Sequence, residues 1–347
     1  MSPRTARLRL AGGVGAVVIV VATMPIWLPA TNFLTLTDGV LAGIYTLLGL
    51  SLVLLIGYTG QLALTVNVTY GLGAYTTAIL TVDDKLNPWL TILIGVAINV
   101  AFALVLALPL LRLQGHFLAV ATLGVALIGF TVFQAAPITG GPNGIDGVTP
   151  LSIGSLQISS DTAFAYLAWI VALLALIGCR NLISGRLGRA MQAIKGSEAA
   201  ASSVGIRPFR VKMMVFVLAA VLSSVAGSLY ATYTGFVSPD AFSVSFTITI
   251  LVMVVVGGLR SVWGVPFGVF AILALNAALQ TYGPSLIPAG GTDIPIVGYG
   301  VVLIVFLMFL PGGLASAAQR LWRSATGSGG PRRSMPEIGG AVSEESS

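Results

Sequence analysis

The sequence predicts an all-α, polytopic integral membrane protein with about ten transmembrane or partly re-entrant helices. Hydrophobic residues make up 56% of the chain and charged residues only 8%, whereas soluble domains carry about 25% charged residues. The mean hydropathy is +0.98. The apolar residues are grouped into runs of roughly 20, the length that an α-helix needs to cross a bilayer. A single long basic interval interrupts these runs.

The apolar runs follow one another along the chain. The first, residues 10–28, comes after three arginines and is followed by no small-residue cleavage site, so we expect a membrane helix that starts in the cytoplasm rather than a signal peptide. The other runs are residues 36–56, 61–81, 88–111, 116–136, 163–180, 213–234, 244–259, 262–282 and 295–311. We expect the runs 61–81 and 244–259 to be re-entrant or broken.

The distribution of positive charge fixes the orientation of these helices. If the N-terminus lies in the cytoplasm, all but one of the 17 Lys and Arg residues fall on the cytoplasmic side, as the positive-inside rule requires, and only Lys85 lies outside. Both termini are then cytoplasmic, and the turn-rich residues 137–161 form the longest external loop. We predict a transmembrane domain in residues 1–323, followed by a disordered cytoplasmic tail, residues 324–347, that is rich in Gly, Ser and Glu.

The basic interval, residues 180–212, holds seven basic residues and one acidic residue. Two blocks of good helix formers within it are separated by Gly196, and the second ends at Gly205. This pattern predicts two short helices at the membrane surface. A loop that only sets topology is the simpler explanation, but its length and small side chains favour a surface that binds another protein.

The numbers and positions of the titratable residues disfavour several kinds of chemistry. None of the three lysines fits the G-x-x-x-x-G-K-[ST] pattern of a nucleotide-binding P-loop, so we expect ATP hydrolysis to take place in another polypeptide. The aspartates map to the external face or to helix ends, and no Asp or Glu lies at mid-membrane, which disfavours both a paired acid and base and an ion-coupled carrier. Cys179 and His116 are the only residues of their types. We therefore expect no enzyme activity, no metal site and no cofactor.

Residues 57–75 form the most polar of the membrane segments. Polar side chains at membrane depth need hydrogen-bond partners or a water-lined cavity, because an unsatisfied group costs several kcal/mol. One interpretation is close helix packing through small residues with interhelical hydrogen bonds. The other is a broken helix that lines a substrate passage, and its candidate residues are Gly60, Gln61, Asn67, Tyr70, Gly71, Gly73 and Tyr75.

The block GRAMQAIKGSEAAASSVGI, residues 188–206, resembles the cytoplasmic coupling loop of ABC importer permeases, in the form seen in the branched-chain amino acid permease family. The resemblance implies that residues 181–212 dock on an ATPase. The residues that it marks for this contact are Arg189, Glu198, Ala199, Ala200 and Gly205.

Five further blocks extend the resemblance over about residues 36–315. Residues 57–75 are similar to the family pattern GYxGQLSLGHxxFxGxGAY, but Thr65-Val66-Asn67 stands where Gly-His-Ala is usual. The other blocks are residues 112–124, 139–145 and 257–268, and the Pro-Gly-Gly-Leu at 311–314. The departure falls where a passage would be lined, so it bears on the cargo more than on the fold.

The resemblance implies a permease subunit of an ABC importer for branched-chain or related hydrophobic amino acids. Its expected partners are a second, similar permease, two ATPase subunits, an external substrate-binding protein and the lipid of the cytoplasmic membrane, with no nucleic acid. Urea or short amides are the alternative cargo. A secondary carrier is the alternative from another class, and a membrane-embedded enzyme would require a carboxylate or histidine cluster that the sequence does not show.

Overall fold

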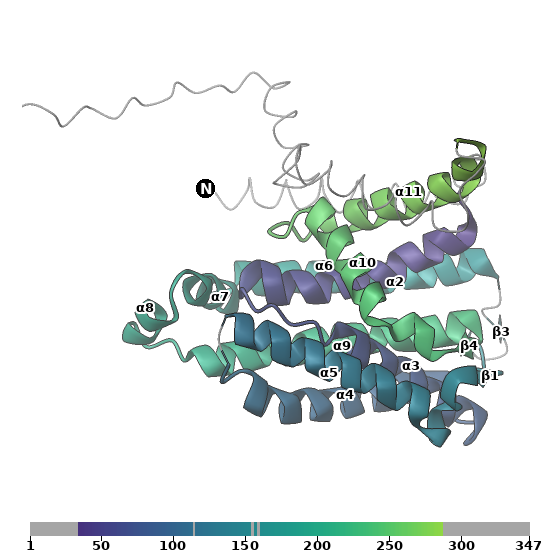
Figure 1. Ribbon diagram of the computed structural model, residues 1–347, viewed down its shortest axis with the longest axis horizontal. Helices are drawn as coiled ribbons and strands as arrows, with labels where there is room; N and C mark the ends of the chain where they lie inside the picture. The colour runs from purple at the N-terminus through teal and green to yellow at the C-terminus, as the bar shows by residue number, and fades with distance from the viewer. Residues whose placement is uncertain (1–33, 114, 154–155, 158–159, 287–347) are drawn as a thin grey trace, which may run out of the picture.

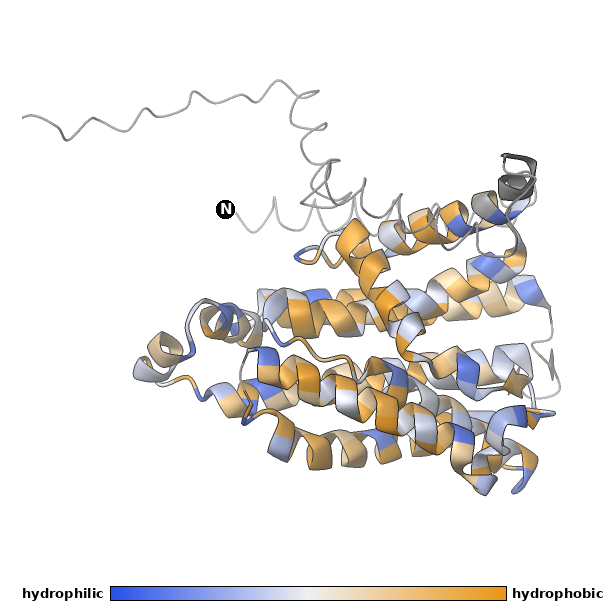
Figure 2. Cartoon of the chain, in the orientation of Figure 1, coloured by the Kyte–Doolittle hydropathy of each residue, from blue (hydrophilic) through white to orange (hydrophobic). Residues whose placement is uncertain are grey.

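The computed structural model describes residues 34–113, 115–153, 156–157 and 160–286. The expected helices at residues 10–28 and 295–311, both termini and the tail at 324–347 lie outside these residues. Each of the other apolar runs contains a helix, and the predicted all-α membrane architecture is confirmed. Most of the long helices run side by side along the long axis of the molecule (Figure 1), with hydrophobic residues along their lengths (Figure 2).

Five helices among the described residues are long and apolar enough to cross a membrane. They are α2 (Leu36–Leu52) continued by the π-helix η1 (Val53–Tyr58), α4 (Pro88–Leu110), α5 (His116–Ala135), α6 (Asp161–Ser184) and α9 (Pro208–Thr234). Three further helices are α3 (Val66–Val82), α10 (Val244–Gly257) and α11 (Gly264–Leu286).

Short elements lie at the two ends of the bundle. At one end are the 3-10 turns η2 (Pro137–Thr139), η3 (Gly141–Asn143) and η4 (Pro239–Phe242), and the two-residue strands β1 (Ile145–Asp146), β2 (Ser152–Ile153), β3 (Leu156–Gln157) and β4 (Phe236–Val237). Strand β1 pairs antiparallel with β4, and β2 with β3. At the opposite end, α7 (Arg186–Gly196) and α8 (Glu198–Ser203) project beyond the bundle (Figure 1).

Local sequence explains where several of these helices begin. Thr35 and Asp38 form a reciprocal capping box at the start of α2. Asn87 accepts a hydrogen bond from Trp89 N ahead of α4, where Pro88 occupies the first helical position. Serine side chains cap α6 and α10 in the same manner. These caps satisfy backbone N–H groups that a helix start leaves without partners.

The structure corrects three of the expected boundaries. The run 61–81 is not helical at its start, because Gly60 adopts φ +71 and α3 begins only at Val66. Helix α6 continues to Ser184 and α9 already begins at Pro208, so the connection between them is residues 185–207 rather than 181–212. Helix α10 has 14 residues and ends where Gly258 takes φ 107, which makes it the shortest of the apolar helices within the described residues.

Helix α3 lies in the interior of the bundle, packed most closely against α9. Gly73 and Gly227 allow the two backbones to approach, since a Cβ on Gly73 would overlap the Ser224 carbonyl and a Cβ on Gly227 would overlap that of Tyr70. Ser228 also donates a hydrogen bond to the carbonyl of Gly73, at 3.2 Å. Small residues that bring helix backbones together are typical of membrane helix pairs.

Helices α4 and α5 carry much of the exposed apolar surface of the described residues. Leu93 and Val105 on α4 are 66% and 68% exposed, and Phe117 and Ile128 on α5 are 77% and 66% exposed. A soluble protein rarely leaves such contiguous apolar patches in water. This outer surface is consistent with a protein that lies in a bilayer.

Candidate functional site

The basic interval folds as the two predicted helices. The turn from α6 into α7 is tight and requires a glycine at position 188. The Gly188 backbone lies so close to that of Ile183 that a Cβ would overlap it. Met191 and Ile194 are buried and anchor α7 to the end of the bundle. The pair of helices is therefore held as an ordered projection.

The turns around α8 are fixed by local hydrogen bonds. Ser197 caps α8 by accepting from Ala200 N at 3.2 Å. Gly205 follows α8 with φ +85, the left-handed conformation that glycine adopts at low cost. The N–H of Ile206 then donates to the Ala201 carbonyl at 3.1 Å. Gly205 is thus a helix-terminating residue, which explains its position in the motif.

The outer face of α8 and the turn after it presents small and apolar side chains to the surface. We call Ala199, Ala200, Val204 and Gly205 the tip patch, and all four are exposed. Val204 is 73% exposed. The segments that flank α8 in sequence carry exposed arginines, at positions 186 and 189 of α7 and at positions 207 and 210 at the start of α9. An exposed apolar patch flanked by charged residues is typical of a surface that binds another protein.

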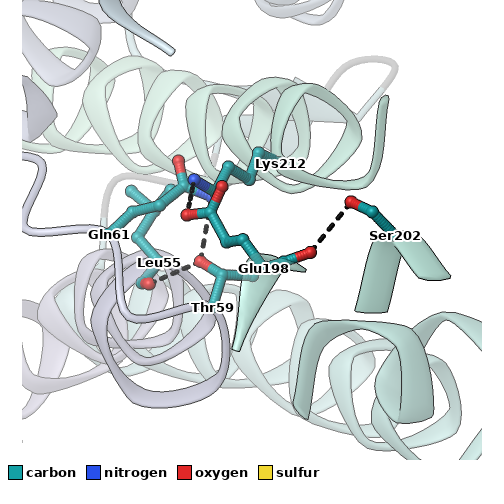
Figure 3. Close-up of polar contacts among 6 residues, drawn as sticks. All are labelled: Leu55, Thr59, Gln61, Glu198, Ser202 and Lys212. Carbon is teal, nitrogen blue, oxygen red and sulfur yellow. Dashed lines mark hydrogen bonds and ion pairs between the residues drawn. The ribbon is translucent and has the colours of Figure 1, made fainter. Parts of the chain in front are cut away.

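Glu198 points away from this surface. Its carboxylate forms an ion pair with the ammonium group of Lys212 on α9, as Figure 3 shows. The Lys212 side chain is only 7% exposed, whereas that of Glu198 is 37% exposed. Ser202 donates to the Glu198 carbonyl at 2.8 Å. The structure thus places Glu198 in a brace between α8 and α9, and its side chain is less available for docking than those of the tip patch.

A second tie joins α7 to the end of the π-helix. The Lys195 Nζ donates to the Gly57 carbonyl at 2.5 Å and lies 3.4 Å from that of Ile56. Neither Lys195 nor Val204 belongs to the site expected from the motif. The sequence indicates that Lys195 lies in the last turn of a short helix. Its partner Gly57 is 138 residues away along the chain, so only the folded structure reveals the contact.

The polar residues near the start of α3 are satisfied in part. Gln61 is buried and donates from Nε2 to Thr59 Oγ1 at 3.0 Å (Figure 3). Asn67 donates from Nδ2 to the Ala126 carbonyl at 3.2 Å and to the Phe242 carbonyl at 3.1 Å. Asn67 thereby connects α3 to α5 and η4. Gly60, in contrast, is exposed.

Two tyrosines of α3 lie in a buried aromatic cluster. The Tyr70 ring stacks on Phe246 with centroids 5.4 Å apart, and the Tyr75 ring lies 5.0 Å from that of Phe133. Phe242 contacts both tyrosines. Both hydroxyl groups are buried without a hydrogen-bond partner among the described residues, as are Oε1 of Gln61 and Oδ1 of Asn67. Such atoms are uncommon in native proteins and carry a free-energy cost.

The two glycines between these tyrosines serve close packing. A Cβ on Gly71 would overlap the Phe133 ring, and a Cβ on Gly73 would overlap the backbone of Ser224. The candidate pathway residues on α3 therefore face neighbouring helices of the same chain rather than its outer surface. The packing interpretation accounts for Gly71 and Gly73, and the unpaired polar atoms of the other residues still require an explanation.

No group of three or more His, Cys, Asp and Glu side chains that could hold a metal ion occurs within residues 34–113, 115–153, 156–157 and 160–286. The one described ion pair is that of Glu198 with Lys212. What the geometry offers is a braced, exposed two-helix projection, joined through Lys195 to the break before α3.

Comparison with known proteins agrees with this architecture. Residues 35–310 match the family model described as "Branched-chain amino acid transport system / permease component". The chain is 30% identical over 305 residues to the high-affinity branched-chain amino acid transport system permease protein LivM of Escherichia coli K12, which covers 81% of this chain and 69% of that protein.

Two further relatives extend the comparison. LivM of Salmonella typhimurium LT2 is 29% identical over 296 residues, which are 78% of this chain and 67% of that protein. The permease protein LivH of Escherichia coli K12 is 30% identical over 161 residues, 45% of this chain and 48% of LivH. No solved structure matches this chain. The family match spans α2 to α11 and both ends of the bundle, so the chain belongs to the permease-component family of branched-chain amino acid transport systems.

Proposed function

We propose that this chain is one permease subunit of an ABC importer that moves branched-chain or related hydrophobic amino acids into the cell. ATP would be hydrolysed by two separate ATPase subunits, a second and similar permease would complete the pore, and an external binding protein would deliver the cargo. Similarity to both LivM and LivH supports a pair of related permeases. The absence of a P-loop lysine pattern from the chain supports separate ATPases.

The observation that carries the proposal is the α7–α8 projection. Its flanking arginines favour the cytoplasmic side of the membrane, where the ATPases work, and both chain termini would then lie on that side too. Its tip patch exposes side chains that a partner could cover, since Val204 is 73% exposed. Its helices are held to the bundle by Lys195 and by the Glu198–Lys212 pair. Because α7 and α8 are connected to the bundle in this way, a movement of these two helices can be transmitted to the membrane helices.

The proposed mechanism is a change of access coupled to the ATPases. Closure of the ATPases on ATP would move α7 and α8 as one body and shift the permease from outward to inward access. Such a shift requires that ATP and the loaded binding protein each favour one state over the other, because a ligand moves an equilibrium only by its differential affinity. The permease itself contributes rigid connections rather than chemistry.

We further propose that the passage runs beside the α3 residues Gln61, Asn67, Tyr70 and Tyr75, and that it is closed in this conformation. The unpaired buried atoms of these side chains support the proposal, because opening the aromatic cluster would let cargo or water satisfy them. Gly60, Gly71 and Gly73 would then shape the backbone on which these side chains are carried.

Docking is tested by changing the tip patch. The double substitution Ala200→Arg, Val204→Arg places two large cations on exposed positions, so the permease should fold normally. We expect the ATPase that co-purifies from native membranes to fall by about tenfold or more, which corresponds to the loss of about 1.4 kcal/mol of binding free energy. ATPase bound per permease is measured on the purified complex.

The matched control is Asn143→Arg, Thr149→Arg, which adds the same charge at exposed positions on the opposite end of the bundle. It should leave ATPase recovery unchanged. Equal recovery of ATPase with the tip-patch variant and the wild type would reject the tip patch as the docking surface. Recovery of no ATPase even with a folded wild-type permease would reject the importer itself and favour a secondary carrier.

The passage is tested by removing single hydroxyl groups. Tyr75→Phe deletes a buried hydroxyl that has no described partner, so stability should be unchanged or slightly increased. If Tyr75 lines the passage, uptake of radiolabelled leucine into vesicles should fall while the amount of assembled complex stays constant. Thr131→Val, which removes an exposed hydroxyl on α5, is the control. Uptake is also measured with excess unlabelled urea, the alternative cargo, as a competitor of leucine. If Tyr75→Phe changes neither the leucine uptake nor its inhibition by urea, this hydroxyl does not line the passage.

A further inference from the structure

The chain leaves the helical conformation between η1 and α3, so a short non-helical segment separates two apolar helices. The Leu55 carbonyl accepts from Gln61 N at 2.9 Å and from Thr59 Oγ1 at 2.6 Å, and these bonds end the helix. Residues 60–64 then run without helical structure before α3. π-Helical turns such as η1 are rare in proteins, and those that occur often lie at functional sites. We call residues 56–62 the junction.

Lys195 binds the junction from the α7 side. A helix end leaves carbonyl groups without donors and carries partial negative charge, which an ammonium group stabilises. The Lys195 Nζ supplies this donor to the Gly57 carbonyl at 2.5 Å. Its aliphatic stem also covers the backbone, since a Cβ on Gly60 would lie 3.4 Å from Lys195 Cγ.

The turn between α10 and α11 holds the junction from another side. Gly57 lies so close to the Leu259 carbonyl that a Cβ would overlap it. The Tyr58 hydroxyl donates to the Arg260 carbonyl at 2.9 Å. Partial burial, together with the charge of Arg260, lowers the pKa of Lys195. The junction is thus held by two parts of the chain, and Lys195 supplies a hydrogen bond from the α7–α8 projection.

We infer that Lys195 is a positioning residue that transmits movement of α7 and α8 to the junction, and through it to α3. The inference rests on the proposed function, because it assumes that an ATPase moves α7 and α8. Met191 and Ile194 fix α7 against the bundle by apolar contact, but apolar contacts can slide. A charged hydrogen bond to one carbonyl is directional, so it couples the position of α7 to that of Gly57.

The test measures whether the junction responds to nucleotide. Leu62, which is 43% exposed, is replaced by Cys in a Cys179→Ala background, and the permease is purified with its ATPase partners. The rate of modification by a polar maleimide is compared without nucleotide and with ATP and vanadate. For the otherwise unchanged permease we expect the two rates to differ by about tenfold or more, which is the low end of the range for a hydrogen bond to a charged group.

Three variants distinguish a role of Lys195 in transmitting movement from a role in holding the structure together. Lys195→Met keeps the stem but removes the donor, so the two rates should become equal while ATPase recovery stays at the wild-type level. Lys195→Arg restores a cationic donor and should restore most of the nucleotide dependence. Lys85→Met removes a lysine at the opposite end of the bundle and should change neither quantity.

Each other outcome decides the matter. Equal nucleotide dependence in Lys195→Met and the unchanged permease would overturn the inference, as would absence of any nucleotide dependence in the unchanged permease. Loss of bound ATPase in Lys195→Met would make Lys195 a docking contact instead of a transmitting one. Failure of the unchanged permease to retain any ATPase would reject the proposed function, and the inference with it.

Discussion

Gly227→Leu is expected to abolish recovery of folded permease. A Cβ at this position would overlap the Tyr70 carbonyl and press on Ala74 N, which are backbone atoms of α3 that cannot rotate away. Overpacking a core typically costs about 1 to 3 kcal/mol when side chains can adjust, and here we expect more than about 3 kcal/mol because two helices must separate.

The effect follows from the position of α3. The same helix pair is held together by Gly73, whose backbone touches that of Ser224, and by the hydrogen bond from Ser228 to the Gly73 carbonyl at 3.2 Å. Asn99 of α4 in turn donates to Ser224 Oγ at 2.9 Å. Moving α9 away from α3 would break these contacts together, and it would disturb the candidate passage on the same helix.

The measurement is the yield of monodisperse permease after extraction in mild detergent, followed by size-exclusion chromatography. Gly178→Leu is the matched control, because the same substitution in α6 meets no atom within 4 Å. Gly227→Ala should give an intermediate yield. A wild-type yield and melting temperature for Gly227→Leu would show that α3 and α9 are not packed as described.

Glu198→Ala is expected to lower the melting temperature of the permease and loosen α8. The substitution leaves the Lys212 ammonium, 7% exposed, without its carboxylate partner. Removing one partner of a buried ion pair costs about 3 to 5 kcal/mol, and we expect about 2 kcal/mol here because Glu198 is partly hydrated. That loss corresponds to a fall in melting temperature of roughly 5 °C.

The two ends of this pair should not be equivalent. Lys212→Met should cost less than Glu198→Ala, because the carboxylate left behind is 37% exposed and can be hydrated by water. The double variant Glu198→Ala, Lys212→Met should recover much of the loss, since it leaves no unpaired charge. Additive losses in the double variant would show that the two side chains do not interact.

These variants also separate two roles of Glu198. In the sequence motif Glu198 is expected to touch the ATPase, whereas the folded chain turns its carboxylate to Lys212. If the brace is its main role, Glu198→Ala and Lys212→Met should weaken ATPase recovery in proportion to their loss of stability. A loss of ATPase recovery in Glu198→Ala that the double variant does not recover would indicate direct contact with the ATPase.

The sequence by itself determined the fold class, the family and the two helices of the basic interval. Apolar runs of spanning length and the location of positive charge act locally or along the chain, so they can be read without coordinates. The sequence also predicted an interruption near this point, because the run 61–81 was expected to be re-entrant or broken, and η1 ends at Tyr58. The extent of the interruption was not predicted, since the bonds from Thr59 and Gln61 to Leu55 decide where η1 ends.

Only the tertiary structure decided which side chains of the motif face outward and which face the bundle. Glu198 and Ala200 lie two residues apart, yet one pairs with Lys212 of α9 and the other is exposed. The partner of Lys195 lies 138 residues away along the chain. Contacts of this kind depend on how α7, α9 and η1 pack in space, because a side chain's partner is set by the packing of distant helices and not by the spacing of its neighbours in sequence.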